Sequence, residues 1–351
     1  MLKKQRVRKK NVAILLALLV LLLLSALFCL LVGSSGMTPD ESLRALFGGG
    51  SDAQVRIMRN IRLPRMLAAL FAGAGLSLSG LIMQTVLGNP MASPSTLGAT
   101  NAAAFGANLS LIVFGGGSLL IGKDLFLSGA GEPFAVSLAA FLFAVLSVLA
   151  VLGLNRVRAF RADAIVLSGV ALGAVWTAAT TVLQYSATDV GLSAAVVWSF
   201  GDLGRASFPA DAMIAAATAA GALFFFILRY RYNALLSGDE TAFSMGVNVR
   251  RLRALSLVAA SLITAVCVAH LGIIGFVGII CPHIAKRLLG QDHRLSIPAS
   301  LLTGAVLLLL ADALSRLIGG GSALPVGAVT SLFGAPFFLV LILRKGGTNR
   351  A

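Results

Sequence analysis

The segment from Gly117 to Lys123 reads G-S-L-L-I-G-K. This is close to G-x-x-x-x-G-K-[ST], the loop that cradles the phosphates of a nucleotide. In that loop a Ser or Thr directly after the lysine supplies the hydroxyl that binds Mg²⁺. Here the next residue is Asp124, so this ligand is missing. We therefore predict no catalytic residue and no ATP hydrolysis by this chain alone.

Other catalytic and metal-binding arrangements are not visible either. The apolar stretches carry no Ser/His, paired-Asp or H-E-x-x-H arrangement. The three histidines are too scattered to propose a metal site, and the three cysteines lack the paired spacing of a disulfide or zinc framework. We predict no metal and no cofactor bound by this chain. The residues concerned are His270, His283, His293, Cys29, Cys267 and Cys281.

Asp312 is the only acid well inside an apolar stretch. A carrier driven by an ion gradient usually needs several carboxylates or histidines inside the membrane. Arg316 follows Asp312 by four residues, the spacing of a helical ion pair. A helix-end ion pair is therefore the simpler interpretation, and an ion-coupled secondary carrier remains the alternative from another functional class.

A short polar motif separates two apolar stretches. Ser237-Gly238-Asp239-Glu240 has the S-x-x-E pattern of a capping box, in which Ser237 accepts the backbone N–H of Glu240. Two acids favour a helix start here, and Gly246 can adopt the left-handed conformation that ends one. The pattern predicts a short rigid helix, either without a role or acting as a lever that docks into a partner. Three arginines then anchor the next span: Arg250, Arg251 and Arg253.

Four arginines, each three residues from the next, precede the second apolar stretch. They are Arg56, Arg59, Arg62 and Arg65. Arginines can anchor a helix at the membrane surface, with the stem in apolar surroundings and the charge in water. The alternative is a basic surface that meets an acidic partner, and the residues by themselves leave both interpretations open.

The elements that position these residues must be membrane helices. The chain has 58% hydrophobic and 12% charged residues and a mean hydropathy of +0.94, outside the soluble globular range. A helix needs about 20 apolar residues to cross the hydrocarbon core. We predict an all-α membrane protein of one domain, residues 1–351, with about ten spans. The stretches are 12–32, 66–87, 95–116, 134–154, 164–185, 208–228, 254–271, 273–290, 298–318 and 324–343.

Two stretches and one gap depart from the simple pattern. The third stretch carries four polar residues, and the eighth is broken by two glycines and a proline. Such groups must face protein or water, so both stretches are predicted to lie inside the bundle. The gap 186–207 holds an apolar run too short to span, which predicts a re-entrant or surface helix.

Charge divides the gaps between the stretches into two sets. Five gaps that alternate to one side contain 20 of the 28 Lys and Arg residues and four acids, whereas the other eight basic residues face nine acids. Short loops rich in Lys and Arg stay in the cytoplasm. We predict a multi-pass protein of a bacterial or archaeal cytoplasmic membrane, with both termini and the basic tail 1–11 inside. The five gaps are 1–11, 152–163, 229–253, 286–294 and 344–351.

This topology also explains the net charge of +15. The basic residues are scattered over five loops without interleaved aromatic residues, so we predict no nucleic-acid partner. The first apolar stretch is about as long as a membrane span and has no clear cleavage site after it. We therefore expect it to be a retained helix in contact with membrane lipid.

Three parts of the chain resemble the FecCD-type permeases, the membrane subunits of ABC importers for iron-siderophores, haem and vitamin B12. The first runs from Arg62-Leu63-Pro64-Arg65 to the G-N-P-M-A-S-P turn that starts at Gly88. The second is G-D-E-T-A-F-S-M-G-V-N-V-R-R-L-R, 238–253, and the third joins 272–294 to 324–338. The resemblance covers about 55–345 and implies the type II ABC-importer fold, with ten spans and both ends inside.

The resemblance assigns roles to particular residues. Arg62, Arg65 and Arg316 match arginines that dock a substrate-binding protein in relatives. The turn at 89–91 matches a cytoplasmic gate, where Asp163 departs from the small hydroxyl residues that relatives often carry nearby. The segment 235–250 matches the helix that couples to the ATPase. The residues are Asn89, Pro90 and Met91 for the gate, and Ser237, Gly238, Asp239, Glu240, Ala242 and Gly246 for coupling.

The implied function is that of a transporter subunit without its own ATPase site. Its partners would be a second permease subunit, identical or paralogous, two ABC ATPase subunits that bind ATP and Mg²⁺, and one extracytoplasmic binding protein. The expected cargo is an iron(III)-siderophore, with haem or a corrinoid such as vitamin B12 as the alternative.

Overall fold

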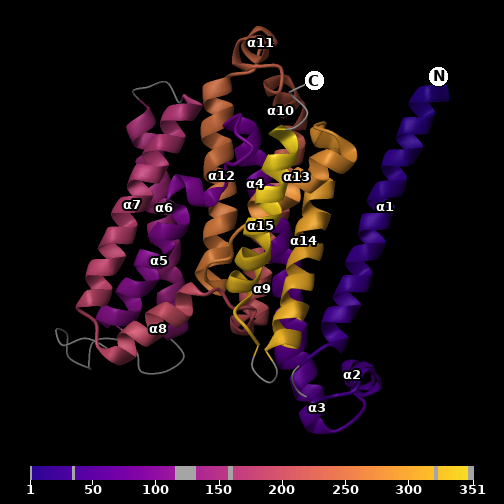
Figure 1. The fold of residues 1–351 in the computed structure, drawn as a ribbon, viewed down its shortest axis with the longest axis vertical. Helices are drawn as coiled ribbons and strands as arrows, with labels where there is room; N and C mark the ends of the chain where they lie inside the picture. Colours follow the sequence, from indigo (N-terminus) through magenta and orange to yellow (C-terminus); the bar gives the residue numbers. More distant parts are fainter. Residues whose placement is uncertain (1, 34–35, 115–131, 157–160, 320–322, 347–351) are drawn as a thin grey trace.

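The computed structural model describes residues 2–33, 36–114, 132–156, 161–319 and 323–346. Within these ranges the chain forms helices and no strand, and Figure 1 shows a bundle of roughly aligned helices. The α-helices are α1 (Leu2–Leu31), α2 (Pro39–Leu46), α3 (Asp52–Ile57), α4 (Leu63–Val86), α5 (Ala99–Leu109), α6 (Glu132–Asn155), α7 (Ala162–Tyr185), α8 (Asp189–Ser199), α9 (Phe208–Ile227), α10 (Arg229–Leu235), α11 (Asp239–Ser244), α12 (Val249–Leu271), α13 (Val277–Leu289), α14 (His293–Ile318) and α15 (Val326–Gly346). Two short π-helices are η1 (Met58–Arg62) and η3 (Ser110–Phe114), and two short 3₁₀-helices are η2 (Pro94–Leu97) and η4 (Leu203–Arg205).

The predicted spans are confirmed as helices. Seven helices among the described residues are long and apolar enough to cross a membrane, and the remaining three stretches hold α5, α13 and α15. The polar groups of the third stretch face protein, as predicted. Asn108 Oδ1 accepts a hydrogen bond from Gln184 Nε2 of α7 at 2.9 Å, and Asn101 Nδ2 donates to the Gly173 carbonyl at 3.1 Å.

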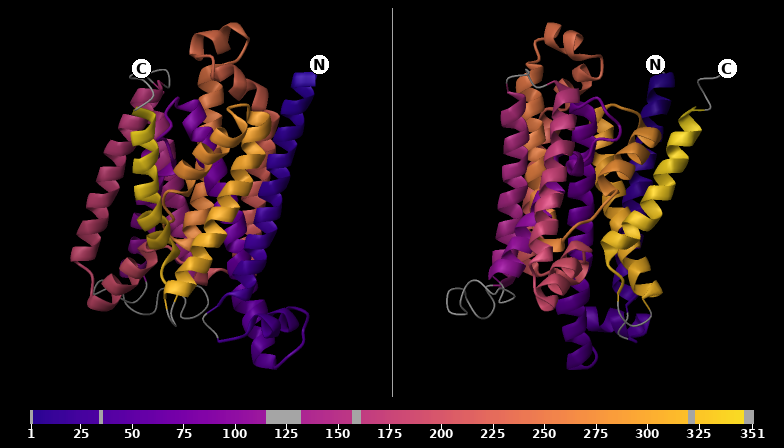
Figure 2. Two further views of the ribbon diagram at one scale, coloured as in Figure 1. Left: turned by 45° about the vertical axis from the view of Figure 1, so that its right-hand side comes forward. Right: turned by 60° about the vertical axis from the view of Figure 1, so that its left-hand side comes forward.

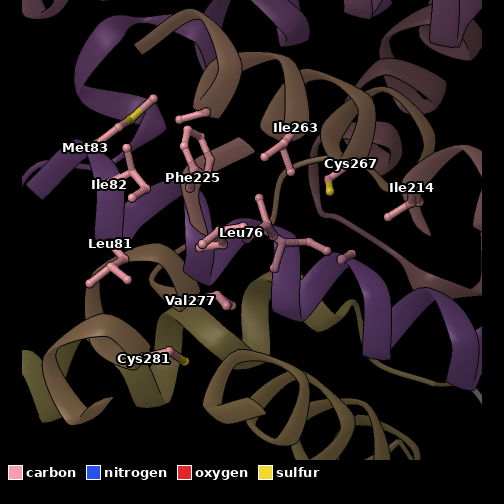
Figure 3. Packing of buried hydrophobic residues seen from close by; sticks show 14 of the residues in the cluster. Leu76, Leu81, Ile82, Met83, Ile214, Phe225, Ile263, Cys267, Val277 and Cys281 are labelled. Carbon is pink, nitrogen blue, oxygen red and sulfur yellow. The ribbon is translucent and has the colours of Figure 1, made fainter. Parts of the chain in front are cut away.

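Helix α4 is the centre of the bundle, with 20 of its 24 residues buried. A Cβ added at Gly73 would overlap the backbone of Gly304 on α14, and one at Gly80 would overlap Gly278 on α13. These glycines therefore let backbones approach closely, which is how helices associate in lipid. Figure 3 shows apolar side chains of α4 meeting those of α9, α12 and α13. The labelled residues are Leu76, Leu81, Ile82, Met83, Ile214, Phe225, Ile263, Cys267, Val277 and Cys281.

The two ends of the bundle differ. The α11 end carries α10 and α11, the start of α1 and the last turns of α15, whereas the α3 end carries α2, α3 and α8 (Figures 1 and 2). This grouping is the one that the charge pattern predicts. Helix α8 is the short helix expected in the gap 186–207. The side of the membrane that each end faces stays a prediction.

Candidate functional site

At the α3 end, Asp312 binds two of the three arginines predicted to dock a partner. Asp312 lies on α14 and is 0% exposed. Its Oδ1 accepts a hydrogen bond from Arg65 Nε of α4 at 2.6 Å, and its Oδ2 lies 2.8 Å from Arg316 Nη2. The predicted i,i+4 pair is thus present, but it is buried and shared with a second helix. Charge-assisted bonds of this kind fix α4 against α14.

The third arginine holds the end of α1. The last four carbonyls of a helix have no partner within the helix. Arg62 Nη1 donates to the Leu30 carbonyl at 2.9 Å, to the Leu31 carbonyl at 3.3 Å and to Ser42 Oγ at 2.8 Å. Arg316 Nη2 donates to the Cys29 carbonyl at 2.9 Å, and its Nη1 donates to the Val32 carbonyl. The arginines therefore cap α1 as well as forming a charged cluster.

We name Arg62, Arg65, Arg316, Asp312 and Asp202 the arginine cluster. Asp202 Oδ1 lies 3.7 Å from Arg65 Nη2, which makes no hydrogen bond within the described part of the chain. Arg65 and Arg316 thus share the enclosed Asp312, and Arg65 Nη2 is left beside the partly exposed Asp202. A guanidinium donor in this position can donate to an anionic group that approaches it. That this group belongs to a binding protein stays a prediction.

The four arginines at the start of α4 and just before it differ in exposure. Arg56 and Arg59 are exposed, whereas Arg62 and Arg65 are only 4% and 8% exposed. The alternative in which all four arginines lie at a lipid surface is therefore wrong for Arg62 and Arg65. Their side chains turn inward because Asp312 and the carbonyls at the end of α1 lie there.

At the α11 end, the predicted short helix is present, but its predicted cap is not. The N-cap of α11 is Gly238, with φ +103°, and no side chain caps the helix. The Ser237 N–H donates to the Ala234 carbonyl, so Ser237 lies in the turn that closes the end of α10. This position keeps the Ser237 hydroxyl from capping α11, and the predicted capping box is wrong. Gly246 does end the segment, with φ +82°, as predicted.

Asp239 and Ala242 attach α11 to the bundle. Ala242 is fully buried, and Asp239 receives two hydrogen bonds from Arg253 Nη2 of α12, at 3.1 and 3.0 Å. Arg253 is 5% exposed, unlike the exposed Arg250 and Arg251. The three arginines predicted to anchor this span therefore differ, because Arg253 alone is buried and bonded to a carboxylate.

Two large apolar side chains are exposed at α11 and its C-cap, which sequence reasoning missed. Phe243 is 74% exposed and Met245 is 65% exposed, while Glu240 is also exposed beside them. Large exposed apolar groups beside polar ones mark interaction sites. The signal was present, because Phe243 and Met245 closely follow the polar run from Ser237 to Thr241.

The predicted gate residues form a turn at the end of α4. Gly88 has φ +57°, and Asn89 Oδ1 accepts a hydrogen bond from the Met91 N–H at 2.9 Å. Pro90 and Met91 are exposed. Asn89 and Leu87 line a groove of about 720 Å³ together with the start of α7, including Asp163. The turn and the position that departs from the family pattern therefore share one groove.

Metal and nucleotide chemistry find no support in the described parts of the chain. Among these residues no group of three or more His, Cys, Asp or Glu side chains could hold a metal ion. The three cysteines are buried and free. The segment 117–123, which resembles a phosphate-binding loop, lies outside the described residues.

A bundle of apolar helices with distinct charged features at its two ends defines a polytopic membrane protein of the permease type. The sequence profile of the FecCD transport family matches residues 19–344, and the chain belongs to that family. It is therefore a permease subunit of an ABC importer, whose ATPase is a separate subunit. Membership in this family sets aside the ion-coupled carrier.

Similar proteins agree with this assignment. The chain is 44% identical over 336 residues to a Methanocaldococcus jannaschii protein that carries the name of an ABC transporter permease, covering 96% of this chain and 95% of the relative. It is 34% identical to the hemin transport system permease protein of Yersinia pestis, covering 92% and 94%. A solved structure titled an inward-facing conformation of a metal-chelate type ABC transporter is 28% identical and covers 95% and 99%, with a TM-score of 0.80. The predicted fold is thus confirmed.

Proposed function

We propose that this chain is the membrane-spanning subunit that imports an iron(III)-siderophore across the cytoplasmic membrane. Two such subunits, identical or paralogous, would enclose the translocation path at their interface. Two ATPase subunits would dock at the α11 end, in the cytoplasm, and one binding protein at the α3 end. The observation that carries this proposal is the placement of a buried arginine cluster and a short helix with an exposed phenylalanine at opposite ends of one bundle.

The arginine cluster suits an acidic binding protein. A carboxylate that reached Arg65 Nη2 would take up the donor that makes no hydrogen bond within the described part of the chain. In a pair of subunits the cluster occurs twice, so a binding protein with two acidic groups would be oriented as well as held. Arg62, Arg65 and Arg316 are thus proposed as docking residues in addition to their bonds within the chain.

The α11 end suits coupling to an ATPase. The segment from Ser237 to Gly246 would dock through Phe243 and Met245, while Asp239 and Ala242 attach it to the bundle. The turn Asn89–Met91 would form the cytoplasmic gate. ATP and Mg²⁺ would bind only to the partner subunits, and this chain would respond to them by movement.

The cargo is proposed from the kinds of protein that this chain is similar to. A hemin permease and a metal-chelate transporter are both similar over nearly their whole length. Both names point to bulky iron or metal complexes. Haem and corrinoids remain the alternative cargoes, because selectivity in such a system would rest with the binding protein.

The test is uptake by proteoliposomes that contain the permease, the ATPase encoded beside it and the neighbouring binding protein. Radiolabelled ferric hydroxamate, hemin and cyanocobalamin would be offered separately, with ATP inside or with an ion gradient alone. We expect ATP-dependent uptake of the ferric siderophore. Uptake of hemin or cyanocobalamin instead would replace the cargo, and uptake driven by the gradient without ATP would overturn the mechanism.

A further inference from the structure

Arg253 connects α11 to the last residue of α4. Its Nη2 donates to both oxygens of Asp239, at 3.1 and 3.0 Å, and its Nε donates to the Val86 carbonyl at 2.6 Å. Val86 ends α4, and Leu87 leads directly into the turn that holds Asn89. One buried side chain therefore bridges the first residue of α11 and the helix end that carries the turn.

The chemistry of this bridge makes it stiff. The Val86 carbonyl is among the last four of α4 and has no partner within the helix, so it is a strong acceptor. A guanidinium is planar and presents its donors in a fixed fork, so a shift of Asp239 tilts the same plane that binds Val86. Gly238 and Gly246, both with positive φ, border α11, and no atom lies within 4 Å of a Cβ added at either position. The bridge thus carries a displacement that the flanking backbone would otherwise absorb.

A second chain of contacts holds the last turn of α4. It runs from Thr85 of α4 through His293, the first residue of α14, to Asn233 of α10. Thr85 Oγ1 lies 2.9 Å from His293 Nε2, and His293 Nδ1 lies 2.9 Å from Asn233 Oδ1. Asn233 Nδ2 also donates to Asp292 at 2.8 Å. The hydrogen bond from Arg294 lowers the pKa of Asp292 to about 2, so this acceptor stays charged at neutral pH. Both halves of the segment between α9 and α12 therefore hold the final turn of α4.

We propose that Arg253 is a positioning residue that transmits movement of α11 to the end of α4 and so to the turn at 88–91. This inference rests on the proposed function, because it takes α11 as the ATPase contact and the turn as the gate. Thr85 and His293 provide a fixed point about which the last turn of α4 can pivot when Arg253 shifts Val86.

The test removes the bridge from either side and follows the turn directly. Arg253→Gln deletes the fork, and Asp239→Asn weakens only its α11 side, where the carboxylate is half-exposed and folding is not at risk. Arg251→Gln is the matched control, because it removes an exposed arginine from the same helix. A cysteine placed at Met91 reports the turn through its rate of reaction with a maleimide, since the native cysteines are buried.

The assembled permease–ATPase complex would be labelled with and without Mg-ATP, and hydrolysis would be measured in parallel. We expect ATP to change the labelling rate in the parent and in Arg251→Gln. In Arg253→Gln and Asp239→Asn the ATP response should fall about tenfold while hydrolysis changes little, the signature of lost coupling. Arg253→Lys should restore part of the response, because it keeps the charge without the fork.

Two failures are distinguishable. If Phe243→Ala leaves ATPase attachment and hydrolysis unchanged, α11 is not the ATPase contact and the proposed function fails. If Phe243→Ala detaches the ATPase but Arg253→Gln keeps the full ATP response at position 91, the docking role stands and the bridge inference is overturned.

Discussion

The two ends of the bundle both bury arginine beside aspartate, but they use the pairing differently. At the α3 end, Asp312 is completely enclosed and shared by two arginines from different helices. At the α11 end, Asp239 is half-exposed and meets Arg253, whose side chain is buried. The first arrangement joins three long helices around one enclosed carboxylate. The second joins a short surface helix to the centre of the bundle.

This difference in exposure indicates that Asp312 keeps its helices fixed, whereas the Asp239–Arg253 pair can follow a movement of α11. A buried carboxylate with several charge-assisted bonds cannot move without leaving charges unpaired, so Asp312 holds the arginine cluster rigidly in place. A half-exposed carboxylate can shift while water replaces part of its contacts, so the Asp239–Arg253 pair can follow a moving partner. The two ends are therefore suited to docking and to coupling respectively.

The largest expected difference between the two ends is in their accessibility from outside the cell, because we predict that they lie on opposite sides of the membrane. Phe47 lies at the α3 end and Met245 at the α11 end, and both side chains are largely exposed, so each can be replaced by cysteine in a separate variant. In intact cells an impermeant thiol reagent should label the Phe47→Cys variant and leave the Met245→Cys variant unlabelled until the membrane is permeabilised. Labelling of the Met245→Cys variant in intact cells would invert the topology.

Removing the enclosed carboxylate should be the most damaging single change. Asp312→Ala leaves Arg65 and Arg316 without their buried partner, and breaking such a pair costs about 3–5 kcal/mol. Asp239→Ala should cost only about 1 kcal/mol because its side chain is half-exposed. Thermal unfolding of the purified variants in detergent would measure both. Equal losses of stability would remove the distinction between the two ends.

Removing a charge from the arginine cluster should weaken docking of the binding protein without unfolding the chain. Arg62→Gln keeps a donor near the Leu30 carbonyl and Ser42 while deleting the charge. We expect about tenfold weaker binding of the binding protein, since about 1.4 kcal/mol is a factor of ten. The affinity of the parent should also fall as salt rises, because the Debye length is only about 8 Å at physiological ionic strength. The exposed Arg59→Gln is the control, and equal weakening there would argue against the buried cluster.

The smallest effect on folding is expected on the face of α11. Glu240 is exposed and does not cap the helix, so Glu240→Lys should change stability by no more than about 0.5 kcal/mol. Its reversed charge beside Phe243 should still reduce ATP hydrolysis stimulated by the binding protein. Normal stimulated hydrolysis and transport in this variant would show that this part of α11 does not touch the ATPase.

The sequence by itself determined the class, the spans and the grouping of the loops. These properties follow from local composition, because apolar length and the distribution of Lys and Arg do not depend on which helices become neighbours. The quoted motifs identified the family before any contact was known.

Only the tertiary structure decided what each charged side chain does. Arg65 and Asp312 are 247 residues apart in sequence, and nothing local indicates that they touch. Within runs of arginines, the fold alone separated Arg62 and Arg65 from Arg59, and Arg253 from Arg251. The failed cap at Ser237 has the same origin, because Ser237 lies in the turn that follows α10, which the S-x-x-E pattern could not reveal. A side chain takes its role from the groups that the packed helices bring to it, and those groups come from distant segments.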